Sequence, residues 1–434
     1  MADQRERSVE PVHEQVMLPP RPLAARKGRG AVSNLQGRFE VDARERVDDG
    51  WWAGPDEGDP GWHGDGGDCG GGGGCGDSGN SDDGGDTANA ACARLDARPA
   101  PVATIITEEF ARTILSRNAS PDIPFGVSLN PYRGCEHGCI YCFARPSHSY
   151  LGLSPGLDFE TQLFAKANAA DLLRRELAHP GYVPESIALG VNTDAYQPCE
   201  RGLGLTRQVL EVLRECAHPV GLITKSSLIE RDIDILAPMA RRRLAMAAIT
   251  LTTLDPAISR TLEPRAASPA RRLRTIRTLV EAGIPCSVSV APVIPFITEP
   301  DIEKILQAAA QAGATGAHYT VLRLPWEVNT LFQQWLQAHF PERAQRVMNR
   351  VRDMRGGKDY DADFASRMHG EGAWADLIGQ RFRRAAARYG LTTDGRRHER
   401  LDCTQFVRPR VVPAAVTVRG RADGQRDLFE SYTE

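Results

Sequence analysis

The 434-residue chain has no run of about 18 consecutive apolar residues, the length that a membrane-spanning helix needs. Its first residues also lack the basic and then apolar pattern of a secretory signal. From these two absences we expect a cytoplasmic protein with no membrane partner. Thiols stay reduced in that compartment, so we expect the ten cysteines to be ligands or core residues rather than disulfides.

The first hundred residues have too few large apolar side chains to build a core. Residues 54–91 are dominated by Gly and Asp, and such a tract buries too little surface to offset its ordering entropy. We therefore expect residues 1–100 to be largely disordered, and we single out residues 27–40 as a basic arm. Residues 41–90 hold thirteen Asp or Glu against two Arg, a local charge of −11 that leaves +8 on the rest of the chain. That basic remainder fits either solvated helix faces with ion pairs or a polyanionic substrate.

From about residue 102, short β-branched or apolar runs alternate with helical patterns. Strands are expected at residues 126–129, 186–191, 220–225, 246–254, 285–292 and 317–324. Helices are expected at residues 167–177, 205–216, 229–244, 270–282, 302–312, 328–340, 344–355 and 372–389. Six β/α units in this order predict an α/β fold, a partial (β/α)6 TIM-type barrel. The expected organisation is a tail over 1–100, the barrel over 101–327, a helical extension over 328–402 and an extended tail over 403–434.

Three cysteines, Cys135, Cys139 and Cys142, lie in one short loop with C-x3-C-x2-C spacing. This spacing lets a loop wrap a cubane iron–sulfur cluster, but a bacterial ferredoxin run supplies four thiolates per cluster. Three thiolates would leave one iron free to bind something other than protein. A structural zinc site needs a fourth ligand, and no second C-x2-C or His pair follows at a suitable distance. Reduced structural cysteines are the other alternative.

The cysteine loop resembles that of the radical S-adenosylmethionine (radical SAM) enzymes. In that superfamily the open iron of a 4Fe-4S cluster binds the amino and carboxylate groups of SAM, and an electron from the cluster cleaves SAM to a 5′-deoxyadenosyl radical. The resemblance implies the 4Fe-4S cluster and SAM as cofactors, and a reducing electron donor such as flavodoxin or ferredoxin. It also implies that the three cysteines hold the cluster and that Tyr141 covers it and approaches the adenine.

Polar residues lie at the ends of the expected second and third strands and line the fourth, at the barrel end where the cysteine loop also lies. They are Asn192 and Asp194, Lys225 and Ser226, and Thr250 and Thr252. As SAM-binding residues, Asp194 would accept from the amino group, Lys225 would pair with the carboxylate, and the threonines would contact the ribose. The same side chains also fit a helix cap, a snorkelling lysine and ordinary strand formers.

Residues 120–390 resemble an uncharacterised bacterial radical SAM family that is grouped with spore photoproduct lyase and called DNA-repair-photolyase-like. The match is carried by the cysteine loop and by residues 150–153, 193–198, 223–226, 262–269, 291–295 and 354–358. The resemblance implies that SAM contacts fall on Asp194, Lys225 and Thr250. It further implies a lyase-like DNA repair activity on damaged DNA.

The chain departs from that family at the hydrogen donor. The lyase uses a cysteine near the end of its second strand, and motif matching places Val191 there. Cys199, a few residues later, is the alternative donor and our candidate catalytic residue. A buried structural thiol is the other interpretation of Cys199.

A short peptide near the end of the sequence suggests a partner. It consists of Gln425, Arg426, Asp427, Leu428 and Phe429, and it resembles the peptide by which bacterial DNA enzymes dock on the sliding clamp. Arg426 replaces the usual Leu. We therefore expect DNA and the sliding clamp as partners. The alternatives are radical SAM modification of RNA, a peptide or a small molecule, and a non-catalytic iron–sulfur protein that senses redox state or iron.

Overall fold

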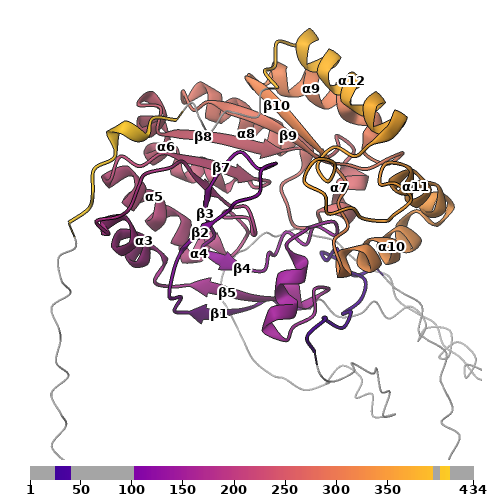
Figure 1. The fold of residues 1–434 in the computed structure, drawn as a ribbon, viewed down its shortest axis with the longest axis horizontal. Helices are drawn as coiled ribbons and strands as arrows, with labels where there is room; N and C mark the ends of the chain where they lie inside the picture. The colour runs from indigo at the N-terminus through magenta and orange to yellow at the C-terminus, as the bar shows by residue number, and fades with distance from the viewer. Residues whose placement is uncertain (1–24, 41–101, 394–400, 411–434) are drawn as a thin grey trace, which may run out of the picture.

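The computed structural model describes residues 25–40, 102–393 and 401–410 (Figure 1). The Gly/Asp-rich tract and the clamp-like peptide lie outside the described residues. No described helix combines the length and the apolar character that crossing a membrane requires.

The main sheet has seven strands in the order β10-β9-β8-β7-β6-β3-β2. Six of them are parallel and follow chain order, and β2 pairs antiparallel with β3 at one edge. Their bounds are β2 (Leu115–Arg117), β3 (Val127–Leu129), β6 (Ile187–Leu189), β7 (Val220–Thr224), β8 (Ala245–Thr250), β9 (Cys286–Val293) and β10 (Gly316–Val321). The sheet is open between β10 and β2. The predicted α/β fold is confirmed, because each of the six expected strands is one of the six parallel strands.

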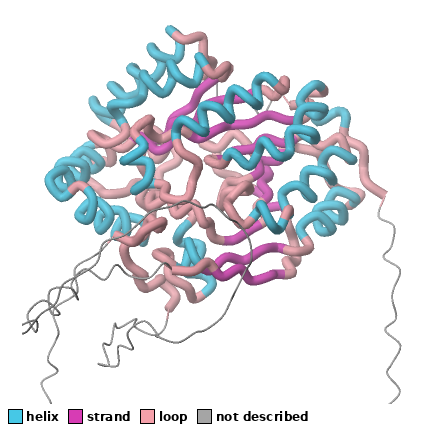
Figure 2. The backbone as a smooth tube through the Cα atoms, turned by 180° about the vertical axis from the view of Figure 1, so that it is seen from behind, coloured by secondary structure: helices cyan, strands magenta, loops and turns pink. Residues whose placement is uncertain are grey.

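Helices surround this sheet (Figure 2). They are α3 (Ala169–Ala178), α4 (Glu200–Leu203), α5 (Leu205–Glu215), α6 (Ile233–Arg241), α7 (Pro256–Leu262), α8 (Pro269–Glu281) and α9 (Ile302–Gln311), with the 3-10 turns η2 (Ser227–Asp232) and η3 (Glu299–Asp301). Each long helix buries one apolar stripe against the strands; in α5 this stripe includes Val209, Leu210 and Leu213, all fully buried. Helix α8 begins at Ser268, whose hydroxyl accepts from the Arg271 N–H.

A second sheet of three strands was not predicted. It has the order β1-β5-β4, with β1 (Ile105–Glu109), β5 (Gln162–Lys166) and β4 (Tyr132–Arg133). The two-residue β4 and the mostly exposed β1 have no hydrophobic alternation from which a strand could be predicted. Because β4 lies between β3 and the cysteine loop, this sheet fixes the entry to that loop. The 3-10 helix η1 (Arg145–Leu151) and the short α2 (Asp158–Thr161) follow the loop.

Three C-terminal helices, α10 (Glu327–His339), α11 (Pro341–Asp353) and α12 (Gly372–Arg388), occupy the predicted helical extension. Helix α12 packs on α9 and β10. Helices α10 and α11 share a hydrophobic core with the cysteine loop, in which Trp335 and Val347 pack in one cluster with Cys139 and Tyr141. The extension is therefore part of the surroundings of the loop.

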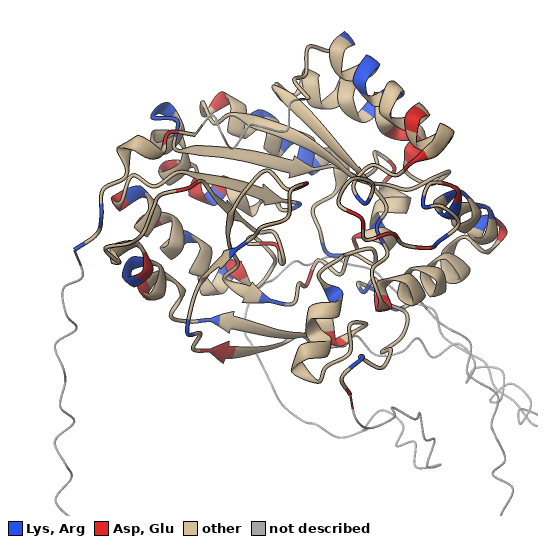
Figure 3. Cartoon of the chain, viewed as in Figure 1, with Lys and Arg blue, Asp and Glu red and all other residues tan. Residues whose placement is uncertain are grey.

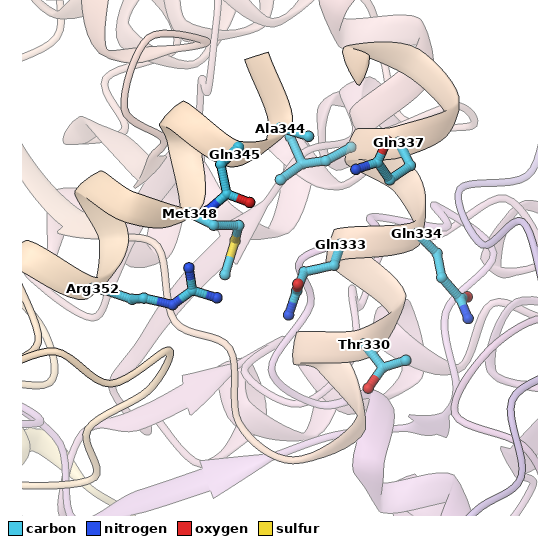
Figure 4. A pocket seen from close by; sticks show the side chains of 9 residues that line it. Thr330, Gln333, Gln334, Gln337, Ala344, Gln345, Met348 and Arg352 are labelled. Atoms are coloured by element: carbon cyan, nitrogen blue, oxygen red, sulfur yellow. The ribbon is translucent and has the colours of Figure 1, made fainter. Parts of the chain in front are cut away.

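A groove of about 290 Å³ lies between α10 and α11 and is lined by both helices (Figure 4). Its polar lining consists mainly of Thr330, Gln333, Gln334, Gln337, Gln345 and Arg352. No carboxylate or thiol is among its lining residues, so the groove offers no acid–base or metal-binding chemistry. We look for the functional site at the carboxyl ends of the parallel strands instead.

Candidate cluster and cofactor site

Backbone hydrogen bonds anchor the cysteine loop to the elements around it. The Cys135 N–H donates to the Phe159 carbonyl at 3.0 Å, and the Ile140 N–H donates to the Leu262 carbonyl at 3.1 Å. Within the loop, the Cys142 N–H donates to the Cys139 carbonyl at 3.2 Å. Cys135 and Cys139 are buried, Cys142 is half-buried, and all three are free thiols. The loop thus presents three cysteines in a fixed backbone frame.

The donor chemistry of this loop fits an iron–sulfur cluster. Burial, with a further contribution from nearby Asp194, raises the pKa of Cys135 well above its usual range, and burial raises the pKa of Cys139 to about 12. The nearby Cys142 raises the pKa of both thiols further, because two thiolates at close range repel each other. Three thiolates crowded in this way, two of them buried, require a bound cation to stabilise them.

A single metal ion fits less well than a cluster. Across the described ranges, no three His, Cys, Asp or Glu side chains converge closely enough to hold one ion. In a cubane each thiolate binds a different iron, so the sulfurs surround the cluster instead of meeting at one point. The placement of the three thiols therefore fits a cluster better than a single ion.

A fully buried ion pair between Arg145 and Glu160 lies beneath the loop. The guanidinium of Arg145 donates to the carbonyls of Cys139 at 2.8 Å and Gly138 at 3.1 Å, and to two further carbonyls nearby. A buried ion pair is tolerated when additional hydrogen bonds satisfy both partners. Here those bonds hold the backbone between the first and second cysteines.

The basic arm over residues 27–40 packs on the same ion pair. The N–H groups of Gly30 and Ala31 donate to the Glu160 carboxylate at 3.0 and 2.8 Å, and Arg29 donates to the Glu160 carbonyl at 2.9 Å. A Cβ atom added to Gly30 would lie 1.8 Å from the Gly138 carbonyl oxygen. Only glycine allows this close approach. The arm is therefore part of the support of the loop, although more than a hundred residues separate the two in sequence.

A second buried polar group lies on the other side of the loop. The hydroxyls of Tyr141 and Thr252 both donate to the carboxylate of Glu263, which pairs with the fully buried Arg272. Burial alone would raise the pKa of Glu263, but Arg272, Lys225 and the two hydroxyls lower it to about 2. Arg272 also donates to the Thr250 carbonyl at 3.1 Å. This network fixes the ring of Tyr141 and joins the loop to the end of β8.

Asp194 connects the second and third parallel strands to the cysteine loop. Its carboxylate accepts from the Thr224 hydroxyl at 2.6 Å, from the N–H groups of Lys225 and Tyr196 at 2.9 Å each, and lies 3.2 Å from the His137 Nδ1. Burial alone would raise the pKa of Asp194, but these groups, led by His137, lower it. All four acceptor positions are occupied, so the structure gives Asp194 a positioning role. Its direct contact with SAM remains a prediction.

Lys225 differs from Asp194 in that no described carboxylate contacts its ammonium group. It is half-buried and lies 5.8 Å from the Tyr141 ring centroid, and within the described part of the chain it contacts no carboxylate. Burial lowers the pKa of Lys225, but Cys139 and Glu263 more than compensate, so the pKa is raised. A cation beside the cysteine loop is thus available to an anionic group.

The remaining residues predicted to bind the cofactor differ in how close they lie to the cysteine loop. Asn192 is exposed, and its backbone N–H donates to the Asn130 side chain at 2.9 Å. The Ser226 hydroxyl caps η2 by accepting from the Leu228 N–H at 3.1 Å. Thr250 and Thr252 are both buried at the end of β8. The structure brings Tyr141, Lys225, Thr252 and the cysteines together, and leaves Asn192 at the margin.

Cys199 lies in a separate small cluster. It packs against Tyr132, Ala165 and Leu205, not in the apolar cluster that contains Tyr141. Burial raises the pKa of Cys199 to about 12. This environment resembles that of a structural thiol. The role of Cys199 as hydrogen donor remains a prediction.

Two ion pairs of the site were missed in the sequence. Glu263 lies in one of the runs that carried the family resemblance, but nothing local indicated that it pairs with Arg272. The Arg145–Glu160 pair and its contact with Gly30 depend on chain segments far apart in sequence. Resemblance to the family could indicate that such positions matter, but hydrophobic periodicity within one sequence could not.

We expect Gly30→Ala to weaken cluster incorporation, because the added methyl group would collide with the Gly138 carbonyl. Overpacking of this kind costs about 1–3 kcal/mol. The matched control is Gly202→Ala in α4, where a Cβ atom meets nothing within 4 Å. After anaerobic reconstitution, iron and sulfide per protein should fall for Gly30→Ala and stay at the wild-type level for Gly202→Ala. Equal cluster content in all three proteins would show that the arm does not support the loop.

The depressed pKa of Glu263 predicts a specific dependence of stability on pH. Its pKa of about 2 in the folded protein lies below the ordinary 4.5, so the carboxylate stabilises the fold fully above pH 4.5 and loses this effect as the pH falls toward 2. The wild type should therefore lose free energy of unfolding more steeply below pH 5 than Glu263→Gln does. Denaturant titrations at several pH values measure this difference. Parallel pH profiles would contradict the assignment.

Comparisons with known proteins agree with this geometry. The family model of the Radical SAM superfamily matches residues 129–309, from the end of β3 through α9. An uncharacterised protein of Mycobacterium tuberculosis is 38% identical over 226 residues, which are 52% of this chain and 66% of that protein. An uncharacterised protein of Methanocaldococcus jannaschii is 24% identical over 223 residues, 51% of this chain and 80% of that protein. The matched segment thus spans just under two thirds of the mycobacterial relative.

Among solved structures, spore photoproduct lyase complexed with dinucleoside spore photoproduct aligns with a TM-score of 0.45 and 14% identity, over 66% of this chain and 80% of the lyase. SuiB of Streptococcus suis bound to S-adenosylmethionine aligns with a TM-score of 0.33 and 11% identity, over 63% of this chain and 51% of SuiB. The family match includes the three-cysteine loop and four of the parallel strands that follow it. Residues 129–309 of this chain therefore match the Radical SAM superfamily.

Proposed function

We propose that this protein is a radical SAM enzyme that acts on nucleic acid in a lyase-like DNA repair reaction. Cys135, Cys139 and Cys142 would hold a 4Fe-4S cluster. When bound, that cluster supplies the electron that cleaves SAM to methionine and the 5′-deoxyadenosyl radical. The observation that carries the proposal is the three-thiol loop at the carboxyl ends of six parallel strands, next to an unpaired lysine.

The residues around the loop have distinct tasks in this proposal. Lys225 binds the carboxylate of SAM, because its ammonium group contacts no carboxylate among the described side chains. Asp194 holds the Lys225 backbone and His137 in place, and so positions both the lysine and the loop. Tyr141, fixed by Glu263, keeps its ring over the cluster region. Thr250 and Thr252 lie at the strand end where the ribose would bind.

The nucleic-acid substrate is supported by the family resemblance and by the charge of +8 outside the acidic tract. Several arginines are neutralised locally: Arg265 pairs with Glu136, Arg271 pairs with Glu230, and Arg381 pairs with two glutamates of the α9 region. Figure 3 shows Lys and Arg on helices at opposite ends of the molecule. Overall basicity is therefore a weaker argument for DNA than it was for the sequence alone.

Other parts of the proposal depend on residues or partners outside the cluster site. Cys199 would be the hydrogen donor, the clamp-like peptide would recruit the enzyme to DNA, and a flavodoxin or ferredoxin would supply the electron. The second candidate function is a non-catalytic iron–sulfur sensor, which would keep the cysteine loop and need no SAM.

The test is anaerobic reconstitution followed by addition of dithionite and SAM, with 5′-deoxyadenosine measured by mass spectrometry. The wild type should produce 5′-deoxyadenosine, and Cys142→Ala should produce none because the cluster loses a ligand. Cys216→Ala is the matched control, since this buried thiol ends α5 and belongs to the main hydrophobic core. It should retain activity within about twofold, as expected away from the site.

Two outcomes would contradict the proposal. A cluster-loaded wild type that leaves SAM intact would favour the sensor. Full activity of Cys142→Ala would remove this cysteine from the ligand set.

A further inference from the structure

Arg323 lies at the rim of the candidate site. It follows β10 (Gly316–Val321) by two residues and so stands at the carboxyl end of the sixth parallel strand, which forms the open edge of the sheet. The centre of its guanidinium group lies 5.4 Å from the ring centroid of Phe143. Phe143 directly follows the last cysteine of the loop and is 41% exposed. Arg323 therefore joins the open edge of the sheet to the cysteine loop.

No described carboxylate contacts the guanidinium group of Arg323. It forms no ion pair with any carboxylate in residues 25–40, 102–393 or 401–410, and its Nε is buried with no hydrogen-bond acceptor. Its Nη1 lies 3.6 Å from the sulfur of Met368, which is a weak acceptor. Removing a guanidinium from water without a compensating partner is unfavourable. An arginine kept in this state suggests a ligand that supplies the missing anion.

Two neighbouring arginines add to the positive charge. Arg355 is buried and donates only to carbonyls, including that of Leu322 at 3.0 Å. Burial, followed by the charge of Arg323, lowers the pKa of Arg355, and Asp361, Tyr360 and Glu371 oppose this shift through space. Arg367 is already paired with Asp122 through two contacts of 2.5 and 2.7 Å. Of these three guanidinium groups only that of Arg367 contacts a carboxylate, so the excess positive charge is at Arg323 and Arg355.

We propose that Arg323 binds a backbone phosphate of a single-stranded nucleic acid, and that Phe143 provides a stacking surface for an adjacent base. The planar guanidinium matches a phosphate with two parallel hydrogen bonds, which lysine cannot reproduce. An exposed aromatic ring beside a cation is the combination by which proteins hold single strands. This inference rests on the proposed function and names the substrate contact of the same site.

Binding of a fluorescently labelled single-stranded DNA oligonucleotide to the cluster-loaded protein tests this assignment, with anisotropy measured at several salt concentrations. Arg323→Gln should weaken binding about tenfold, as for loss of one charge-assisted hydrogen-bonded contact. The slope of log affinity against log salt should become shallower by about one. Arg323→Lys should lie between Gln and the wild type. The control Arg277→Gln removes an exposed arginine of α8 and should change affinity by less than twofold.

Thermal unfolding separates a binding role from a structural role. Because Arg323 is unpaired and adds to the charge around Arg355, Arg323→Gln should leave the melting temperature unchanged or raise it. A lower melting temperature, or an unchanged DNA affinity and salt slope, would overturn the proposal. Competition by polyglutamate as strong as by unlabelled DNA would also overturn it, because the subsite would then recognise any polyanion.

SAM cleavage in the absence of DNA distinguishes this inference from the proposed function. Arg323→Gln should still produce 5′-deoxyadenosine from SAM, because Arg323 does not contact the cluster ligands. A wild type that cleaves SAM and binds no DNA would refute the phosphate subsite and leave the radical SAM assignment standing. A wild type that cleaves no SAM but binds DNA through Arg323 would refute only the radical SAM reaction.

Discussion

The buried contact between Arg145 and Glu160 is the interaction on which the candidate site depends. One guanidinium group holds the carbonyls between the first two cysteines, and one carboxylate holds the backbone of the distant arm. Three thiols can be positioned for a cluster in a mostly buried loop only if the loop backbone keeps its conformation before the cluster binds. Because both members of the pair are fully buried, each depends on the other for its hydrogen bonds. The arm, the loop and α2 therefore form one unit.

The charges around the loop fall into two kinds. Asp194, Glu160 and Glu263 each have several donors within hydrogen-bond distance, so these carboxylates organise strands and loops. Lys225 and Arg323 lack a carboxylate partner among the described side chains, and both stand at strand ends that face the cysteine loop. A paired charge is used by the fold, and an unpaired charge is available to a ligand. This difference is the physical basis for proposing that SAM binds at Lys225 and the substrate at Arg323.

The sequence predicted the parts of the structure that have a local pattern. The six parallel strands and the long helices were found from hydrophobic periodicity, and the cysteine loop was found from its spacing. The small sheet was missed because β4 has two residues and β1 is mostly exposed, so neither leaves a periodic signal. Asp194 was singled out as a SAM contact, which stays a prediction, and its neighbours Thr224 and His137, which occupy its oxygens, come from other segments. Contacts of this kind depend on the fold and cannot be read from one chain segment.

The central claim is that three cysteines hold a cluster with one iron open to SAM. Electron paramagnetic resonance of the anaerobically reconstituted and reduced protein tests this claim most directly, with spectra recorded before and after SAM is added. The account predicts the signal of a reduced 4Fe-4S cluster that changes shape when SAM binds the open iron. Zinc in place of iron, or a cluster signal that SAM leaves unchanged, would contradict it.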